Sequence, residues 1–416
     1  MHEWVNVSCD CPWSGGESCM FSFLGPSAWN RLSVGLVLLL AVTAGSVPLE
    51  WTYATGNYAW TAMVSPNGRY VLAGSDDMHA YFFQVNGEGK PVWTHVAQGY
   101  VRHVAVSGDG ACAAVSDTAG NVYFFQSNKS GIPAWSFHSA AAIDGVDLSE
   151  DATRLVVGDR EGNIYLFETS QSNQPVWHAV IDGGFMSLAL FGPNALAASS
   201  RHGGIYFYDL VLSKSSYGWS FRESTSFPQL AVSEDLGYIF AGGSDGDVYV
   251  ISSSGRTIGS QRLGGSVSAI SVSESARVVI AGSTNGNVSQ YLIKDRLESA
   301  GSALAHAPIT SVAVSDDGKR IAIATIDGII SMFSQTLADP LWTYKAGAIV
   351  HSLSMSGNGM VMAASSDSGK IYLFNERMEV QTQGSSFATL LIPIAVTVIL
   401  VACLVWRTKK NRIPKR

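Results

Sequence analysis

The stretch VAVSDDGKRIAIA, residues 312–324, has recognisable counterparts in eight places along this 416-residue chain. We take Ser315 as the anchor residue of this copy. The run AMVSPNGRYVLAGS at residues 62–75 carries the equivalent anchor, Ser65. The other equivalent positions are Ser107, Ser149, Phe191, Ser233, Ser273 and Ser356. Neighbouring copies are 40 to 42 residues apart. A repeat of this length indicates an array of similar supersecondary units.

Two further features keep the same spacing from this anchor residue. Thirteen residues after it, seven of the eight copies have a glycine, whereas the first copy has Met78. The glycines are Gly120, Gly162, Gly204, Gly246, Gly286, Gly328 and Gly369. Fourteen residues before the anchor, Gly259 and Gly301 stand in two copies and tryptophan in the other six. The tryptophans are Trp51, Trp93, Trp135, Trp177, Trp219 and Trp342.

Each copy is typical of four short strands joined by tight turns. Alternating runs such as VAVS, apolar runs and aromatic runs such as NIYLF are separated by Asn-Gly, Asp-Gly and Ser-Gly turns. A four-stranded sheet repeated every 42 residues or so predicts an all-β, eight-bladed β-propeller, with seven blades as the alternative. The fourth strand of the last blade is then the N-terminal segment around Trp51, which closes the ring. The tryptophans are expected to pack between blades.

The repeat resembles a known superfamily. The run VVGDREGNIYLFETSQSNQPVW, residues 156–177, is similar to a quinoprotein-type (PQQ-like) repeat, and the SxDGxxxA runs at residues 107–114 and 315–322 resemble WD-type repeats without the Trp-Asp pair. The resemblance implies a propeller over about residues 49–374. Enzymes of the quinoprotein group use an axial cofactor and adjacent cysteines. Because this sequence has no adjacent cysteine pair, we expect no cofactor and a non-catalytic member.

Charge and cysteine content exclude several other functions. Residues 46–386 contain 19 basic and 30 acidic side chains, so their net charge is 19 − 30 = −11. An acidic body repels phosphate backbones, and we therefore expect no nucleic-acid partner. Of the five cysteines only Cys112 lies within the repeats, so no internal disulfide is expected there. No histidine or cysteine cluster with metal-ligand spacing is present, and we expect no metal.

The two ends of the chain carry hydrophobic segments. Residues 387–406 are twenty uncharged residues, long enough for a transmembrane helix, and the basic tail at residues 407–416 is expected in the cytoplasm. Residues 1–45 read as an extension and signal peptide, with Met20 as a possible start and an uncleaved anchor as the alternative. The predicted propeller, residues 46–375, then lies outside the membrane, in an extracellular or periplasmic space, with residues 376–386 as a linker.

Binding candidates are sought where the repeats differ. The loop before each first strand is expected on the same face as the turn after the second strand, and this face points away from the membrane. We predict a binding site there, although the aromatic members would alternatively plug the ring centre. The candidates are Tyr58, Tyr100, Arg102, Phe185, Arg201, His202 and Phe227. The recurring turn acids, including Asp76, Asp117, Asp159 and Asp367, are expected to make local hydrogen bonds. Asn128 and Asn287 are possible glycosylation sites at surface turns.

The sequence leaves three functional hypotheses. The first is a membrane-anchored scaffold that binds a protein partner or ligand, within a complex of the cell envelope. The second is a quinone-dependent dehydrogenase or another enzyme built on a propeller, against which the missing cysteine pair and metal cluster count. The third is a sensor whose short basic tail contacts a cytoplasmic partner.

Overall fold

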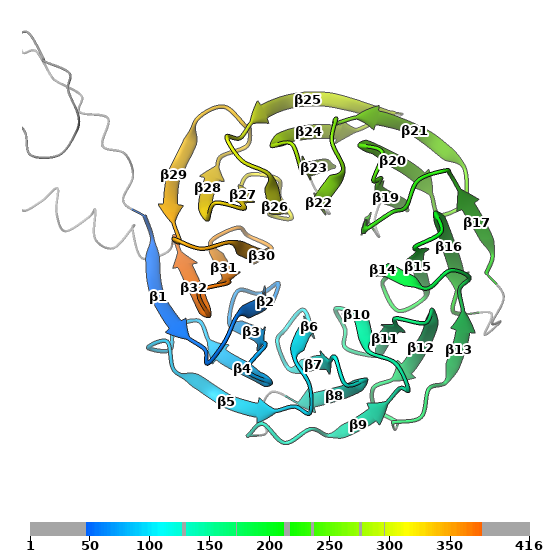
Figure 1. Cartoon of the computed structure of the whole chain (residues 1–416), viewed down its shortest axis with the longest axis vertical. Helices are drawn as coiled ribbons and strands as arrows, with labels where there is room; N and C mark the ends of the chain where they lie inside the picture. Colours follow the sequence, from blue (N-terminus) through cyan, green and yellow to red (C-terminus); the bar gives the residue numbers. More distant parts are fainter. Residues whose placement is uncertain are drawn as a thin grey trace, which may run out of the picture. The chain divides into compact units, whose positions relative to one another are not determined.

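The fold is a closed ring of eight four-stranded antiparallel sheets (Figure 1). The computed structural model describes residues 47–126, 130–171, 173–211, 217–233, 237–273, 277–294 and 296–376. This part of the chain contains 32 strands and no helix. Each sheet is one blade, with its first strand at the ring centre and its fourth strand on the outer wall. The predicted eight-bladed propeller is confirmed, and the seven-bladed alternative is wrong.

The first four blades follow one another along the chain. Blade 1 contains β2 (Ala59–Val64), β3 (Tyr70–Ser75), β4 (His79–Gln84) and β5 (Pro91–Val96). Blade 2 contains β6 (Val101–Val106), β7 (Cys112–Asp117), β8 (Asn121–Gln126) and β9 (Trp135–His138). Blade 3 contains β10 (Ile143–Leu148), β11 (Arg154–Asp159), β12 (Asn163–Glu168) and β13 (Trp177–Val180). Blade 4 contains β14 (Phe185–Phe191), β15 (Ala195–Ser200), β16 (Gly204–Asp209) and β17 (Trp219–Arg222).

The other four blades complete the ring. Blade 5 contains β18 (Gln229–Ser233), β19 (Tyr238–Gly242), β20 (Asp247–Ser252) and β21 (Thr257–Arg262). Blade 6 contains β22 (Val267–Val272), β23 (Val278–Ser283), β24 (Asn287–Ile293) and β25 (Leu297–Leu304). Blade 7 contains β26 (Ile309–Val314), β27 (Ile321–Thr325), β28 (Ile329–Phe333) and β29 (Pro340–Lys345). Blade 8 contains β30 (Val350–Met355), β31 (Val361–Ser366), β32 (Lys370–Asn375) and β1 (Leu49–Ala54).

Blade 8 is built from both ends of the described chain. The N-terminal strand β1 pairs antiparallel with β32, so that Trp51 lies opposite Leu373 and Tyr53 opposite Ile371. The ring is therefore closed by backbone hydrogen bonds between segments more than 300 residues apart. The sequence prediction that the Trp51 strand completes the last blade is confirmed.

The anchor serines, present in every blade except blade 4, have a structural role inside the blade. Ser107, for example, is fully buried, donates its hydroxyl to Asp109 Oδ1 at 2.8 Å and accepts the N–H of Cys112 at 3.0 Å. The hydroxyl likewise accepts the backbone N–H of the residue five positions later at Ser65, Ser149, Ser315 and Ser356. The hydroxyl thus replaces water for a buried backbone group in the first turn of the blade.

Each of the six tryptophans joins its own blade to the next one. Trp135 stacks on Phe124 of its own blade at 5.1 Å and lies 5.3 Å from Phe167 of blade 3, ring centroid to centroid. Its indole N–H donates to the carbonyl of Thr169 at 3.1 Å, thirty-four residues along the chain. Trp51 and Trp219 make the same bond at the same separation. The prediction that these side chains pack between blades is confirmed.

The turn after the second strand needs a left-handed residue at its fourth position. Gly120 has φ 91° and Gly162 has φ 100°, and a Cβ on Gly120 would lie 2.4 Å from the carbonyl oxygen of Ser139. In blade 4 this residue is Gly203, with φ 83°, and not Gly204, because the first turn of that blade is one residue shorter. In blade 1 it is Met78, which takes φ 67° despite its side chain.

Both predicted hydrophobic end segments lie outside the described residues, as do the basic tail and Asn128. Within residues 47–376, as far as the structure describes them, no helix is long and apolar enough to cross a membrane.

Candidate functional site

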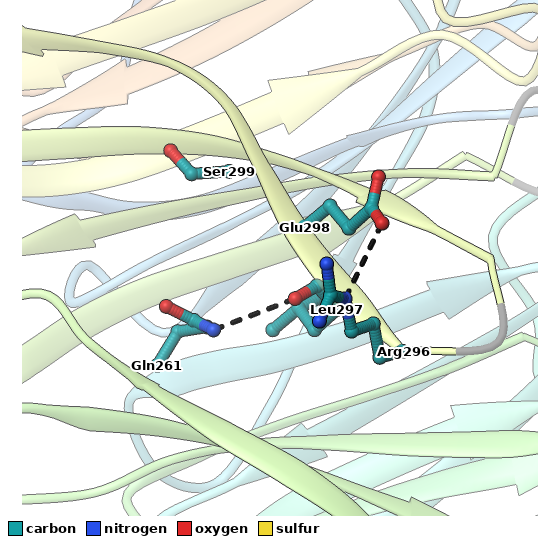
Figure 2. A pocket seen from close by; sticks show the side chains of 5 residues that line it. All are labelled: Gln261, Arg296, Leu297, Glu298 and Ser299. Atoms are coloured by element: carbon teal, nitrogen blue, oxygen red, sulfur yellow. Dashed lines mark hydrogen bonds and ion pairs between the residues drawn. The ribbon is translucent and has the colours of Figure 1, made fainter.

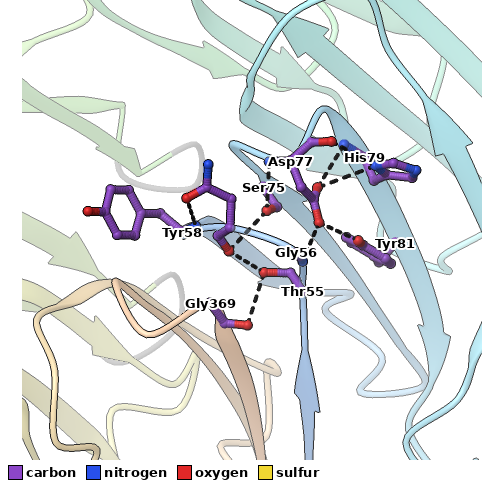
Figure 3. Close-up of polar contacts among 9 residues, drawn as sticks. Thr55, Gly56, Tyr58, Ser75, Asp77, His79, Tyr81 and Gly369 are labelled. Carbon is purple, nitrogen blue, oxygen red and sulfur yellow. Dashed lines mark hydrogen bonds and ion pairs between the residues drawn. The ribbon is translucent and has the colours of Figure 1, made fainter.

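The loops that enter the first strands and the turns that follow the second strands lie on one face of the ring. The backbone N–H of Asp76 donates to the carbonyl of Tyr58 at 2.9 Å, and the N–H of Thr118 donates to the carbonyl of Tyr100 at 3.0 Å. Equivalent bonds tie Arg201 to Gly184 and Asp367 to Ile349. The predicted shared face is therefore confirmed, and we call it the turn face. Figure 3 shows it where blade 8 meets blade 1, with Tyr58 pointing away from the polar cluster around Asp77.

A β-bulge interrupts the first strand in seven of the eight blades, always at its second residue. In blade 2, for example, Val101 pairs with Asp117 and His103 with Ser116, which leaves Arg102 out of the register. A bulge releases a residue from the ladder and redirects its side chain. The bulged residues, here called the bulge ring, are Trp60, Arg102, Asp144, Met186, Ser268, Thr310 and His351. In blade 5 the equivalent residue, Pro228, precedes the strand.

Arg102 is the most highly connected member of the bulge ring. Its guanidinium makes a bidentate pair with the buried Asp76 of blade 1, with Nε–Oδ1 at 3.1 Å and Nη2–Oδ2 at 3.0 Å. The charge centre lies 4.5 Å from the ring of Trp60 and 5.6 Å from the ring of Tyr100. The pair with Asp76 raises the pKa of Arg102 above its usual value. Arg102 is thus a fixed cation between two aromatic rings.

The neighbouring blade extends this cluster. Trp60 stacks on the imidazole of His351 in blade 8, with ring centroids 4.2 Å apart. His351 Nε2 in turn contacts Asp367 Oδ1, in the second turn of the same blade. Asp76, Arg102, Trp60, His351 and Asp367 therefore form a continuous chain of contacts across three blades.

A second charged cluster lies further along the ring. Asp144 in the bulge ring of blade 3 accepts from Arg160 Nε and Nη2 at 3.0 and 2.9 Å. It also accepts from Arg201 Nη2 of blade 4 at 3.3 Å. The two arginine side chains are 58% and 50% exposed, whereas Asp144 is 18% exposed. Two guanidinium groups on one carboxylate leave donors of both arginines directed at solvent.

These contacts divide the turn face into two arcs. Blades 8, 1, 2, 3 and 4 form the charged arc, which contains both clusters. Blades 5, 6 and 7 form the neutral arc, where neither the bulge position nor the second residue of the second turn carries charge. The residues at these positions of the neutral arc are Pro228, Ser268, Thr310, Ser244, Thr284 and Ile326.

The structure places most predicted site residues on the turn face of the charged arc. Tyr58 and Tyr100 are 49% and 45% exposed. Arg201 and His202, in the second turn of blade 4, are exposed as well. Arg102 is brought into contact with Tyr100. Whether these residues bind a partner stays a prediction.

Two predicted members of the site do not reach the surface. Phe185 and Phe227 are both fully buried, so the expectation that they lie at an exposed mouth is corrected. The ring of Phe185 fills the space left by Gly145 and Gly158 of blade 3, where any Cβ would lie within 2.7 Å of it. Phe227 packs edge-on against Tyr249 at 5.4 Å. Both side chains point between blades, where apolar area is removed from water.

The other predicted positions have mixed outcomes. Asp117 and Asp159 accept several hydrogen bonds from their own turns, as expected. Asp76 and Asp367 instead pair with Arg102 and His351, so the local interpretation is incomplete for these two. Asn287 is the first residue of β24, half-buried, and donates Nδ2 to the carbonyl of Leu263 at 2.8 Å. In the described part of the chain, no group of three His, Cys, Asp or Glu side chains is arranged to hold a metal ion.

Sequence reasoning missed Trp60, Asp144, Arg160 and His351. For Trp60, Asp144 and His351 the available signal was the column five residues before the anchor, which reads Trp, Arg, Asp, Met, Pro, Ser, Thr and His across the eight copies. The columns six and three residues before the anchor are apolar in all eight copies. A column that varies inside an otherwise regular repeat indicates side chains that do not pack within the blade.

The structure is an eight-bladed β-propeller with an asymmetric turn face, and one stretch of it is similar to a WD-type repeat. The family model described as "WD domain, G-beta repeat" matches residues 300–334, which span the end of β25 and strands β26 to β28. No curated protein sequence matches the chain.

Solved structures share the fold at low sequence identity. Sqt1 from Saccharomyces cerevisiae is 14% identical with a TM-score of 0.69, and the match covers 80% of this chain and 99% of that one. The C-terminal WD40 domain of Sif2 is 14% identical with a TM-score of 0.70, covering 79% and 98%. BamB from Moraxella catarrhalis is 16% identical with a TM-score of 0.63, covering 80% and 98%.

Proposed function

We propose that this protein is a non-catalytic, membrane-anchored scaffold that binds a partner protein through the charged arc of its turn face. The observation that carries the proposal is the bulge ring. The same backbone device redirects a side chain in seven blades, yet the redirected residues are charged or aromatic mainly on one side of the ring. Arginine and aromatic residues held in fixed positions are the types that dominate protein-binding hot spots.

Preorganisation of the cluster supports binding. Arg102 is held by Asp76 and by two rings, and Arg160 and Arg201 share Asp144. Side chains that are already ordered lose less conformational entropy when a partner binds. Exposed Tyr58 and Tyr100 add rigid apolar area with a polar tip beside these charges.

The membrane location rests on the sequence. The uncharged run at residues 387–406 and the basic residues after it support a single span with the propeller outside the cytoplasm. Strand β32 starts at the turn face, next to Gly369, and runs to the opposite face. The chain therefore leaves the propeller from that opposite face, which supports a turn face directed away from the bilayer.

The test compares the two arcs directly. The full chain carrying Tyr100→Ala, Arg160→Ala and Arg201→Ala is crosslinked in intact membranes, and captured proteins are quantified by mass spectrometry against wild type. The matched control carries Ser244→Ala and Thr284→Ala on the neutral arc. We expect one or a few partners to be lost from the charged-arc variant and retained by the control. Equal capture by both variants contradicts the proposal.

A further inference from the structure

The outer wall of the ring differs between blades in how it is filled. At most borders between blades, an aromatic residue of the fourth strand packs on the third strand of the following blade. This aromatic residue lies twelve residues before the anchor of the following blade. Tyr53 lies 5.1 Å from both Tyr81 and Phe83, and Phe137 lies 5.0 Å from both Tyr165 and Phe167, ring centroid to centroid. At the border of blades 7 and 8, Tyr344 contacts Tyr372 and Phe374 in the same way.

Blades 5 and 6 lack this aromatic residue. Their equivalent positions are Gln261 and Ala303, and the receiving positions in blades 6 and 7 are Ser289 and Ser331 in place of tyrosine. Blade 3 also has a small residue, Ala179, but there the buried Tyr206 and Tyr208 of blade 4 fill the border. At both borders of blade 6, the two facing strands therefore carry small or polar residues where most other borders carry aromatic ones.

Cavities lie at these two borders. Between blades 5 and 6 the outer strands border a depression of about 400 Å³, lined by Gln261 and residues 296–299. There Arg296 pairs with Glu298, and Gln261 donates to the carbonyl of Leu297 (Figure 2). This first cavity is open and polar. Between blades 6 and 7 a smaller cavity of about 180 Å³ is lined mainly by apolar side chains, including Ala303, Leu304, Ile329 and Phe333.

The second cavity has the size and lining that suit one aromatic ring. An engineered apolar cavity of about 150 Å³ binds benzene. Ala303, Ser331 and Phe333 line it, and they correspond to Tyr53, Tyr81 and Phe83 at the border of blades 8 and 1. The molecule itself thus shows, at its other borders, which chemical group occupies this position.

A polar group at the edge of the cavity favours a phenol over a plain phenyl ring. In blades 1 and 5 the tyrosine at the receiving position donates its hydroxyl to an acid of the second turn. Tyr81 Oη lies 2.6 Å from Asp77 Oδ2 (Figure 3), and Tyr249 Oη lies 2.7 Å from Asp245 Oδ2. The equivalent acid in blade 7 is Asp327, and Ser331 is too short to make that bond. Asp327 instead binds Thr325 and His306, both of which line the cavity.

The strand beside the cavity offers a way to present such a ring. Strand β25 is the outer edge of its sheet, which has the order β22-β23-β24-β25, and Leu304 at its end is 74% exposed. An edge strand can pair with an added extended segment, whose alternate side chains then point to one side of the sheet. On one of these sides lies the border with blade 7.

We propose that the cavity between blades 6 and 7 binds a tyrosine side chain of a partner protein, presented on an extended segment that pairs with the outer edge of β25. This site lies on the outer wall, where the wall meets the turn face of the neutral arc at His306 and Thr325, and it shares no residue with the charged arc.

The test uses the purified full chain and three probes. The first is p-cresol, the side-chain analogue of tyrosine, detected by saturation-transfer NMR. The second is a short acetylated peptide, Thr-Val-Tyr-Val-Thr, and the third is the same peptide with alanine in place of tyrosine. We expect p-cresol to bind, and the tyrosine peptide to bind about tenfold or more tightly than the alanine peptide.

Variants locate the site. Ala303→Phe and, independently, Ser331→Tyr fill the cavity from blades 6 and 7, and each is expected to abolish binding of p-cresol and of the tyrosine peptide. The control Val180→Phe adds a ring at an exposed outer-wall position of blade 3 and is expected to leave binding unchanged. Three results overturn the proposal: no binding of p-cresol, binding that survives in both filled variants, or a tyrosine peptide that binds no better than the alanine peptide. Self-association of the chain that is lost in the filled variants would show a second copy as the occupant and would also overturn it.

Discussion

The charged arc and the neutral arc share one backbone plan and differ in almost every side chain that the plan leaves free. Both have four-stranded blades, buried anchor serines and bulged first strands. The charged arc adds ion pairs that involve the bulge ring, and the blade borders within it contain a tryptophan of the fourth strand. The neutral arc has Gly259 and Gly301 at two tryptophan positions and uncharged residues at its bulge positions.

This difference shows which residues build the ring and which are available for other roles. Both arcs form their blades with the same order of four antiparallel strands, so this backbone ladder does not depend on the side chains that differ between the arcs. The tryptophan layer is not required at every border, because Gln290 Nε2 donates to the carbonyl of Gln335 where an indole is missing in blade 6. The closed ring distributes stability over eight borders, and two of them are free to diverge.

The largest expected effect is the loss of a tryptophan from the charged arc. Trp135→Ala removes a ring that stacks on two phenylalanines and an N–H bond to Thr169. We expect a loss of about 3 to 5 kcal/mol in the free energy of unfolding, measured in urea. Gln261→Ala, on the outer strand of the neutral arc, is expected to lose less than about 1 kcal/mol. Equal losses would mean that the two arcs are packed alike.

The next effect concerns the hydrogen bonds between first strands of adjacent blades. In the neutral arc Ser271 Oγ accepts the N–H of Val314 at 3.2 Å, whereas in the charged arc Asp147 Oδ2 accepts the N–H of Leu190 at 2.8 Å. Burial raises the pKa of Asp147 to about 6, although the N–H groups of Leu190 and Leu148 lower it in part. The folded state therefore binds a proton more tightly than the unfolded chain, where the pKa is about 3.9.

Asp147→Ser is accordingly expected to stabilise the protein only at neutral and higher pH. An acid with a raised folded pKa favours folding below its unfolded pKa, and this contribution is lost as the pH rises through about 6. We expect the variant to gain about 1 to 3 kcal/mol over wild type near pH 8 and to lose that advantage near pH 4. Ser271→Asp should show the opposite change. A difference that does not vary with pH would rule out this origin.

The sequence predicted the ring far better than the rim. Serine, glycine and tryptophan recur because the turn, the left-handed position and the blade border recur, so the eight copies reinforce one another and even the closing role of Trp51 could be predicted. The site lacks this redundancy. Phe185 and Phe227 lie six residues before the anchor, in the column of the fully buried Ala59 and Val101, whereas Tyr58 and Tyr100 lie seven residues before it. Gly145 and Gly158 of the neighbouring blade leave the space that the ring of Phe185 fills. The alignment of the copies therefore contained the burial of both phenylalanines, whereas the pairs of Arg102 with Asp76 and of Arg201 with Asp144 depend on contacts between blades, which no single repeat encodes.

Met78 marks where the first copy of the repeat departs from the other seven. It takes φ 67° in a turn that is otherwise glycine, and its side chain is 42% exposed. Met78→Gly removes the left-handed strain and little buried area, so we expect a gain of about 0.5 to 1 kcal/mol in the free energy of unfolding. Gly120→Ala at the same position of blade 2 should destabilise, since its Cβ would collide with Ser139. A loss in both variants would show that the side chain of Met78 contributes more than the backbone strain removes.

The smallest effect on stability is expected at the rim itself. The side chain of Arg160 is 58% exposed and that of Arg201 is 50% exposed. Exposed ion pairs contribute about 0 to 1 kcal/mol to the free energy of unfolding. The variant Arg160→Ala with Arg201→Ala should therefore unfold within about 1 kcal/mol of wild type, and Thr284→Ala on the neutral arc should do the same. The two arcs should then differ only in partner capture, which falls for the arginine variant alone. A large loss of stability in the arginine variant would instead assign these residues to the fold, since Asp144, only 18% exposed, would be left without its partners.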